Sequence, residues 1–179
     1  MKSPAREVTE VMAALWLATL LLFATGARAD DLPEYRLKSA FVYNFMLFTE
    51  WPAATGNTLN LCIYGKDPFG AEIDGLQGKA VVGRSIALHR KATGESLKNC
   101  QAVFIAASVM GSLPNILESL KGQSTLTLAD SPGAMRQGVA LNMGVAQGKV
   151  SFEANLQVAR SAGLNLSSKL LRLATEVQQ

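Results

Sequence analysis

Apolar and polar positions change their spacing several times along the chain, and these changes predict alternating helices and strands. Residues 34–51 are apolar at helical spacing and are followed by Pro52, which predicts a helix that stops there. Two later segments, 67–75 and 112–122, carry an early proline and a closing glycine and predict short helices. Short apolar or alternating runs predict strands at 59–65, 85–90, 100–106 and 125–130.

The last third of the chain predicts a hairpin followed by helices. Residues 138–155 form two strand-like runs joined around Ala146-Gln147-Gly148, which is a turn signal. Residues 155–163 and the segment from Ser167 onward have helical spacing. We therefore expect an α/β fold: a three-layer sandwich with a mostly parallel sheet, helices on both faces, and an antiparallel hairpin near the C-terminal end.

The first segment has the pattern of an export signal. Basic residues precede an apolar run at 11–23, and small residues at Ala27 and Ala29 fit a cleavage site after Ala29. The apolar run is shorter than the roughly 20 residues of a transmembrane helix, although an uncleaved anchor remains the alternative. We expect residues 1–29 to be a signal peptide and residues 30–179 to form one exported domain.

Charge excludes two classes of partner. Residues 30–179 keep 14 of the 17 Lys and Arg and 12 of the 14 Asp and Glu, a net charge of about +2. These charges are dispersed, and no basic block or aromatic-basic stripe occurs. The sequence therefore predicts neither nucleic acid nor an anionic membrane surface as a partner.

The two cysteines, Cys62 and Cys100, lie in the expected exported part. An even count in an oxidising compartment favours a disulfide, and the mostly parallel sheet allows the strands at 59–65 and 100–106 to be neighbours. Two free thiols remain the alternative. A zinc site is not predicted, because His89 is the one histidine and no paired-ligand spacing occurs.

Catalytic motifs are scarce. The stretch GKDPFG follows a strand and leads into a helix, where α/β proteins bind phosphate, but it lacks a glycine-rich motif and Asp67 would repel an anion. A capped turn is the better interpretation. His89 lies beside Arg90 and Lys91, which oppose its protonation, and no G-x-S-x-G motif occurs. We predict no catalytic residue, metal or cofactor.

Glu153 is the polar residue of most interest. In KVSFEAN the alternation puts Val150, Phe152 and Ala154 on one face and Glu153 on the other, toward solvent or a cleft. Arg160 follows on the next predicted helix and is able to pair with it. A surface salt bridge is one interpretation, and a partner or ligand contact of Glu153 and Arg160 is the other.

The aromatic helix at 34–51 has charged residues on one side, which excludes a membrane span. At 100° per residue, Val42, Tyr43 and Met46 fall on this charged side, and we predict that they form a dimer or partner contact. Asn44 falls in the middle of the expected buried arc. The buried arc is predicted to contain Leu37, Ala40, Phe41, Phe45, Leu47, Phe48 and Trp51.

Six stretches in this order and spacing resemble the YfiR-like family of exported proteins over residues 35–177. They are AFVYNFMLFTEWP, LNLCIYGKDPFG, the strand that begins at Cys100, TLTLAD, GVALNM and KVSFEANLQVARSAGLNLSSKLLRLA. The resemblance implies an α/β fold in the periplasm and no catalytic residues. It also implies that Cys62 and Cys100 match a family disulfide. Some members carry a second pair in the segment matching Gly133–Leu141, where this chain has no cysteine.

The resemblance implies a repressor that binds the periplasmic sensor region of an inner-membrane diguanylate cyclase and lowers cyclic di-GMP. An outer-membrane OmpA-like lipoprotein would relieve this repression by sequestering the repressor. The alternative is a periplasmic domain that senses a small ligand near Glu153 and Arg160. An uncharacterised hydrolase is a third hypothesis, which turnover that is lost on changing a single polar residue would support.

Overall fold

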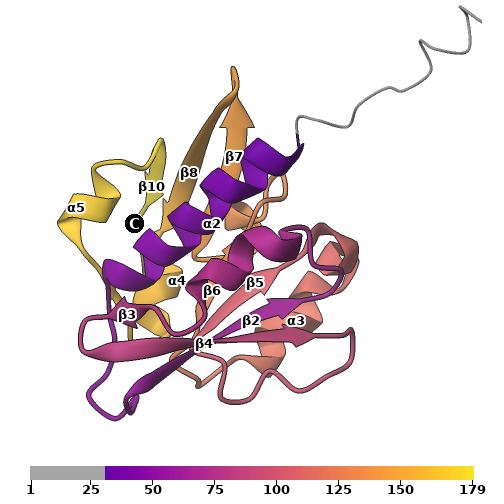
Figure 1. Ribbon diagram of the computed structural model, residues 1–179. Coiled ribbons are helices and arrows are strands. Elements are labelled where there is room, and N and C mark those ends of the chain that lie inside the picture. The colour runs from indigo at the N-terminus through magenta and orange to yellow at the C-terminus, as the bar shows by residue number, and fades with distance from the viewer. Residues whose placement is uncertain (1–30) are drawn as a thin grey trace, which may run out of the picture. The chain divides into compact units, whose positions relative to one another are not determined.

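An eight-stranded sheet organises the part of the chain that the computed structural model describes, residues 31–179 (Figure 1). The predicted signal peptide and its cleavage after Ala29 lie outside these residues. In spatial order the strands are β10 (Glu176–Gln178), β8 (Lys149–Asn155), β7 (Leu141–Ala146), β6 (Leu126–Ala129), β5 (Ala102–Ile105), β2 (Thr58–Tyr64), β4 (Arg84–Lys91) and β3 (Ala80–Val81).

Most neighbouring strands are parallel. The exceptions are the β7–β8 hairpin and the β3–β4 pair, which are antiparallel. The hairpin turn falls at Gln147 and Gly148, which both have positive φ, as the sequence indicated. A separate two-stranded sheet pairs β1 (Thr49–Glu50) with β9 (Asn165–Leu166). The predicted α/β fold, with its mostly parallel sheet and C-terminal hairpin, is confirmed.

Helices cover both faces of the sheet, because alternate residues of the central strands point to opposite sides. Leu61 and Ile63 of β2 pack with α2 (Asp31–Leu47) and the 3-10 helix η1 (Gly70–Leu76). Cys62 and Tyr64 pack instead with the 3-10 helix η2 (Ala107–Ser112) and α3 (Leu113–Ser119). The remaining helical segments are η3 (Met135–Gln137), α4 (Leu156–Ser161) and α5 (Ser168–Leu171).

Helix α2 is rotated relative to the predicted orientation. Val42 and Met46 are fully buried together with Phe45, whereas Leu37 is 50% exposed and Asn44 is exposed. The prediction that Val42 and Met46 form an outward contact surface is therefore wrong. Tyr43 is half-buried, and its hydroxyl donates a 3.0 Å hydrogen bond to the Ala80 carbonyl oxygen.

Two predicted helices end earlier than expected. Helix α2 stops at Leu47, after which Thr49 enters β1 and Trp51 donates its indole N–H to the Met46 carbonyl oxygen at 3.1 Å. The helix predicted from Ser167 is only α5, and the following residues turn back to form β10, which pairs parallel with β8. Strand β10 was not predicted.

The disulfide between Cys62 and Cys100 is confirmed. The S–S distance is 1.98 Å and the Cα–Cα distance is 5.9 Å. The bond is possible because β2 and β5 are adjacent and parallel. Cys100, two residues before β5, therefore lies close to Cys62 in β2. In the described part of the chain, no helix has the length and apolar character needed to cross a membrane.

Candidate functional site

A polar cavity lies at the C-terminal end of β6, and we call it the β6 cavity. Its volume is about 420 Å³. Ligands of open α/β sheets typically bind at this edge, outside the carboxyl ends of parallel strands. The charged and polar side chains that line it are those of Glu34, Lys38, Asp130, Asn142, Ser151, Glu153 and Thr175.

Strand register brings these residues together. Ala129, the last residue of β6, pairs with Asn142 of β7, so Asp130 leaves the sheet directly beside that strand. Across the hairpin, Asn142 pairs with Glu153, and Gly144 pairs with the serine of β8. Because β7 continues beyond the end of β6, residues of the hairpin line one side of the cavity, and residues of the first turns of α2 line another.

A buried ion pair closes the α2 side of the cavity. The Lys38 ammonium lies 2.7 Å from Asp130 Oδ2 and 2.5 Å from Glu34 Oε1. The Tyr35 hydroxyl donates to the same Asp130 oxygen at 3.0 Å, and the Lys38 Nζ lies 4.6 Å from the centre of the Tyr35 ring. The side chains of Lys38 and Asp130 are only 5% and 4% exposed. This pair fixes the N-terminal half of α2 to the end of β6.

Glu153 lies on the hairpin wall and is half-buried. Its Oε2 accepts a hydrogen bond of 3.3 Å from Asn142 Nδ2, while Asn142 Oδ1 accepts one of 3.2 Å from the Ser131 backbone N–H. Arg160 lies exposed on α4 and does not line this cavity. No ion pair joins Glu153 to Arg160, both of which the structure describes.

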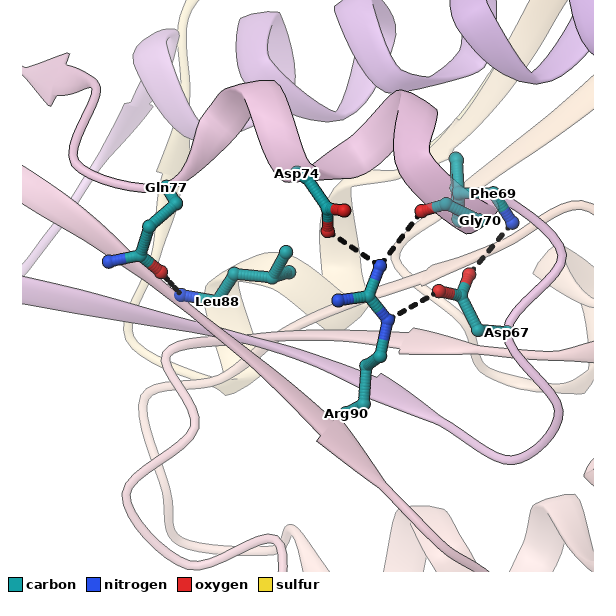
Figure 2. Close-up of polar contacts among 7 residues, drawn as sticks. All are labelled: Asp67, Phe69, Gly70, Asp74, Gln77, Leu88 and Arg90. Carbon is teal, nitrogen blue, oxygen red and sulfur yellow. Dashed lines mark hydrogen bonds and ion pairs between the residues drawn. The ribbon is translucent and has the colours of Figure 1, made fainter.

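A second polar cluster holds η1 against β4 (Figure 2). Arg90 donates from Nε to Asp67 Oδ2 at 2.7 Å, and from one terminal nitrogen to Asp74 Oδ1 at 2.7 Å and the Gly70 carbonyl at 2.8 Å. The hydrogen bond to Asp67 is the main cause that raises the pKa of Arg90, and the bond to Asp74 is the next. Asp67 also accepts from the Phe69 backbone N–H at 2.7 Å.

This cluster explains the GKDPFG stretch. The Asp67 carboxylate caps the turn, as the capped-turn interpretation predicted, although the helix begins only at Gly70 and is a 3-10 helix. The same carboxylate also binds Arg90, which was not predicted. Asp74 is the second carboxylate that accepts a hydrogen bond from Arg90. His89 is exposed, with one ring nitrogen 2.9 Å from Asn60 Oδ1. The contacts of Arg90 with Asp67, Gly70 and Asp74 hold η1 and the turn before it against β4, and we call them the Arg90 clasp.

Sequence reasoning found Glu153 but missed Lys38 and Asp130. Lys38 is one of the charged residues of the helix predicted at 34–51, whose charged side was expected to lie away from the core, and its partner Asp130 lies 92 residues away. One signal was present: Asp130 directly follows a predicted parallel strand, the position at which α/β proteins place binding residues. Within residues 31–179, no group of three or more His, Cys, Asp or Glu residues is arranged to hold a metal ion.

Solved structures with a similar fold include a conserved domain protein from Vibrio cholerae O1 biovar eltor, with a TM-score of 0.55 and 9% identity. Another is the ABC domain in complex with L-Trp from Streptococcus pneumonia, with a TM-score of 0.53 and 9% identity. Each alignment covers 80% of this chain and 60% of the other, so the chain spans about 60% of the length of these structures. At this identity the likeness shows the fold alone. No curated protein matches the sequence.

The sequence profile of one family covers most of the chain. It matches residues 35–175, from the first turns of α2 to the threonine that lines the β6 cavity. This range includes every strand of the sheet except β10, and both residues of the disulfide. The chain belongs to the YfiR/HmsC-like family (DUF4154).

Proposed function

We propose that this protein is a periplasmic repressor that binds the sensor region of an inner-membrane diguanylate cyclase and thereby lowers cyclic di-GMP. The observation that carries the proposal is the family match over residues 35–175. The disulfide between Cys62 and Cys100 fits an oxidising compartment. In this proposal the protein is regulatory rather than catalytic.

Repression requires the protein to bind one conformation of the sensor region more tightly than the other. A binding partner with equal affinity for both conformations shifts no equilibrium, however tightly it binds. Since Val42 and Met46 are buried, the contact must use other residues. Tyr43, Glu153 and Arg160 retain accessible surface, and we keep them as the proposed contact residues. An OmpA-like lipoprotein that sequesters the repressor, and a homodimer, are further proposed partners.

Deletion of the gene tests the proposal directly. We expect cellular cyclic di-GMP to rise, and the purified sensor region of the cyclase to recover this protein in a pull-down. The substitution Arg160→Glu should weaken that recovery by about tenfold if Arg160 is a contact, because charge reversal at an interface turns attraction into repulsion. Arg136→Glu, at another exposed arginine, is the matched control. Unchanged cyclic di-GMP in the deletion strain would contradict the proposal.

A small-ligand sensor is the second candidate function, and the β6 cavity favours it. The cavity combines a volume within the usual range of ligand pockets with charged groups at the carboxyl edge of a parallel sheet. One structure of similar fold is described as a complex with L-Trp, which makes free amino acids a reasonable first set to screen. A thermal shift with a small molecule, together with unchanged cyclic di-GMP on deletion, would favour this function over the first.

A further inference from the structure

We propose that a second cavity, between residues 92–99 and helix α3, binds a neutral saccharide. We call it the crossover cavity, and its volume is about 850 Å³, within the usual range of ligand pockets. Binding there is independent of cyclase control and of the β6 cavity, because it requires only the purified protein and uses other residues.

The cavity exists because the connection from β4 to β5 contains no helix. These two strands lie parallel to β2, one on each side of it, so the connection must cross one face of the sheet. Such a crossover usually carries an α-helix that covers the sheet. Here residues 92–99 cross as a loop, and Leu97 packs in the same core cluster as Ile116 of α3. The space that a crossover helix would fill therefore lies open between the loop and α3.

The crossover loop is fixed at several points. The Gly94 N–H donates to the Tyr64 hydroxyl at 2.8 Å, and the Asn60 side-chain amide donates to the Asn99 carbonyl oxygen at 2.9 Å. Directly after the loop, the disulfide ties Cys100 to β2. A loop that is already tethered loses little conformational freedom when a ligand binds, so this cavity is preorganised.

Tyr64 gives an independent indication of a ligand. Its side chain lines the cavity beside Gly94, and the residue is only 7% exposed. The hydroxyl accepts the Gly94 N–H, but its own proton has no acceptor among residues 31–179. A buried tyrosine hydroxyl usually finds a partner, and it is able to donate and accept at once. An oxygen of a bound ligand would accept this proton.

The lining of the cavity carries no net charge. Glu95 and Lys98 are the charged side chains among the lining residues that the structure describes, and their charges are opposite. The Glu95 carboxylate already accepts from the Ala92 backbone N–H and lies 3.8 Å from Lys91. A cationic or zwitterionic ligand would therefore find no free carboxylate, and an anion would find one exposed lysine. The charges favour a neutral ligand.

Amide and hydroxyl side chains supply the remaining polar groups. They include those of Thr93, Ser96, Asn99, Ser112, Asn115 and Gln123. Within residues 31–179, the side chains of Asn99 and Asn115 have no hydrogen-bond partner. Gln123 donates from Nε2 to the Ser119 carbonyl oxygen at 2.9 Å, which leaves its Oε1 open. An amide both donates and accepts, as each hydroxyl of a sugar does, so the two sets of groups are complementary.

The floor of the cavity is apolar. Leu97 and Ile116 are buried and line it together with the ring of Tyr64. One face of a pyranose ring consists mainly of C–H groups, and these gain by leaving water for an apolar surface. Amides and hydroxyls around an apolar floor therefore fit a saccharide, whose hydroxyls surround an apolar face.

The test uses protein purified from the periplasm after expression of the full chain, with chitobiose and maltotriose as neutral probes. The chitosan dimer, which is cationic, and digalacturonic acid, which is anionic, are the control ligands. We expect calorimetry to detect at least one neutral sugar at about 1 mM, and both charged sugars to bind at least about tenfold more weakly. The backbone amide resonances of Gly94 and Asn115 should shift with the neutral sugar.

Two variants locate the site. Asn115→Leu removes the amide at an exposed position and should weaken binding about tenfold, whereas Asn57→Leu, at an exposed asparagine outside the cavity, should change nothing. Ser112→Trp fills the cavity and should abolish binding, and it removes no helix cap, because the Ser112 side chain makes no capping bond. Glu118→Trp, on α3 but outside the cavity, is its control.

Three results would overturn the proposal. They are no binding of either neutral sugar at about 1 mM, equal binding of a charged sugar, and unchanged binding by the folded variants Asn115→Leu and Ser112→Trp. Circular dichroism establishes that each variant is folded. None of these outcomes bears on repression of a cyclase, which cyclic di-GMP levels in the deletion strain test separately.

Discussion

The ammonium of Lys38 and the carboxylate of Asp130 are almost completely removed from water, at 5% and 4% exposure. Taking two charges out of water is costly, and the cost is balanced only while both partners are present. We expect Asp130→Ala to lower the free energy of unfolding by up to about 3–5 kcal/mol, because it leaves the buried lysine with only the partly exposed Glu34 as a counter-charge. Urea unfolding followed by circular dichroism measures this loss.

The double substitution Lys38→Met/Asp130→Leu is the matched control. It removes both charges and fills the space with apolar atoms, so it should cost clearly less than Asp130→Ala alone. Glu118→Ala changes an exposed residue and serves as a reference. If Asp130→Ala is no less stable than Glu118→Ala, the ion pair contributes nothing to folding.

Lys38 also shows why part of the site was not predictable. A lysine is almost never fully buried unless it is paired, so the pattern alone assigns it to solvent. Its burial depends on Asp130, which directly follows β6 and is far from Lys38 in the sequence. Glu153 was identified because strand alternation is local, whereas the ion pair is a property of the assembled fold.

At the scale of elements, helix α2 is the clearest case in which periodicity misleads. Apolar side chains occur on nearly every side of this helix, so the 3.6-residue period does not select one face. The buried side of the helix holds Lys38, Val42, Phe45 and Met46, together with Thr49 just after it. The six longer strands were predicted because their apolar or alternating runs are short and bounded by glycine or polar residues, whereas the two- and three-residue strands β1, β3, β9 and β10 were not.

Strand β10 could not be recognised from its own residues. Glu176, Val177 and Gln178 form no alternating or apolar run, and all three are exposed. The strand exists because Thr175 donates from its backbone and its hydroxyl to the Phe152 carbonyl oxygen, which aligns the chain with β8. Pairing with a neighbour outweighs the weak intrinsic propensity of these residues.

The corrected orientation of α2 predicts opposite effects at two positions. Met46→Ala should lower the free energy of unfolding by about 2–5 kcal/mol, because it leaves a cavity in the core between the helix and the sheet. Leu37→Ala, at a half-exposed site on the same helix, should cost about 0.5 kcal/mol or less. Chemical denaturation compares the two, and equal losses would mean that the assigned faces are incorrect.

The Arg90 clasp predicts a local effect on η1. Arg90→Lys keeps the positive charge but loses the planar fork that reaches Asp67, Asp74 and the Gly70 carbonyl together. Because this arginine is 45% exposed, we expect a global loss of no more than about 1 kcal/mol. Hydrogen exchange should accelerate in η1 and remain unchanged in α3. Arg136→Lys is the control. If it accelerates hydrogen exchange in η1 as much as Arg90→Lys does, the Arg90 clasp is not what holds η1 in place.

At the scale of the whole molecule, the Cys62–Cys100 disulfide joins β2 to the segment just before β5, across a separation of 38 residues. Closing a loop of this length restricts the unfolded chain, which corresponds to a stabilisation of up to about 4 kcal/mol. Both cysteines are buried, at 1% and 3% exposure, so the bond is protected in the folded protein. The disulfide is therefore expected to raise the fraction of folded molecules and not to shape a binding surface.

Because the disulfide acts mainly through stability, its removal should lower the fraction of folded protein. The Cys62→Ser/Cys100→Ser variant should lose up to about 4 kcal/mol of stability. Under the proposed repressor function, it should also raise cyclic di-GMP where this loss depletes the folded protein. Cys62→Ala/Cys100→Ala is the companion variant, because it removes the bond without burying two hydroxyl groups. Denaturation curves and cyclic di-GMP levels measured on the same variants separate stability from regulation. If either variant is stably folded and still represses normally, the disulfide is not a regulatory switch, and redox control must be excluded from the function of this protein.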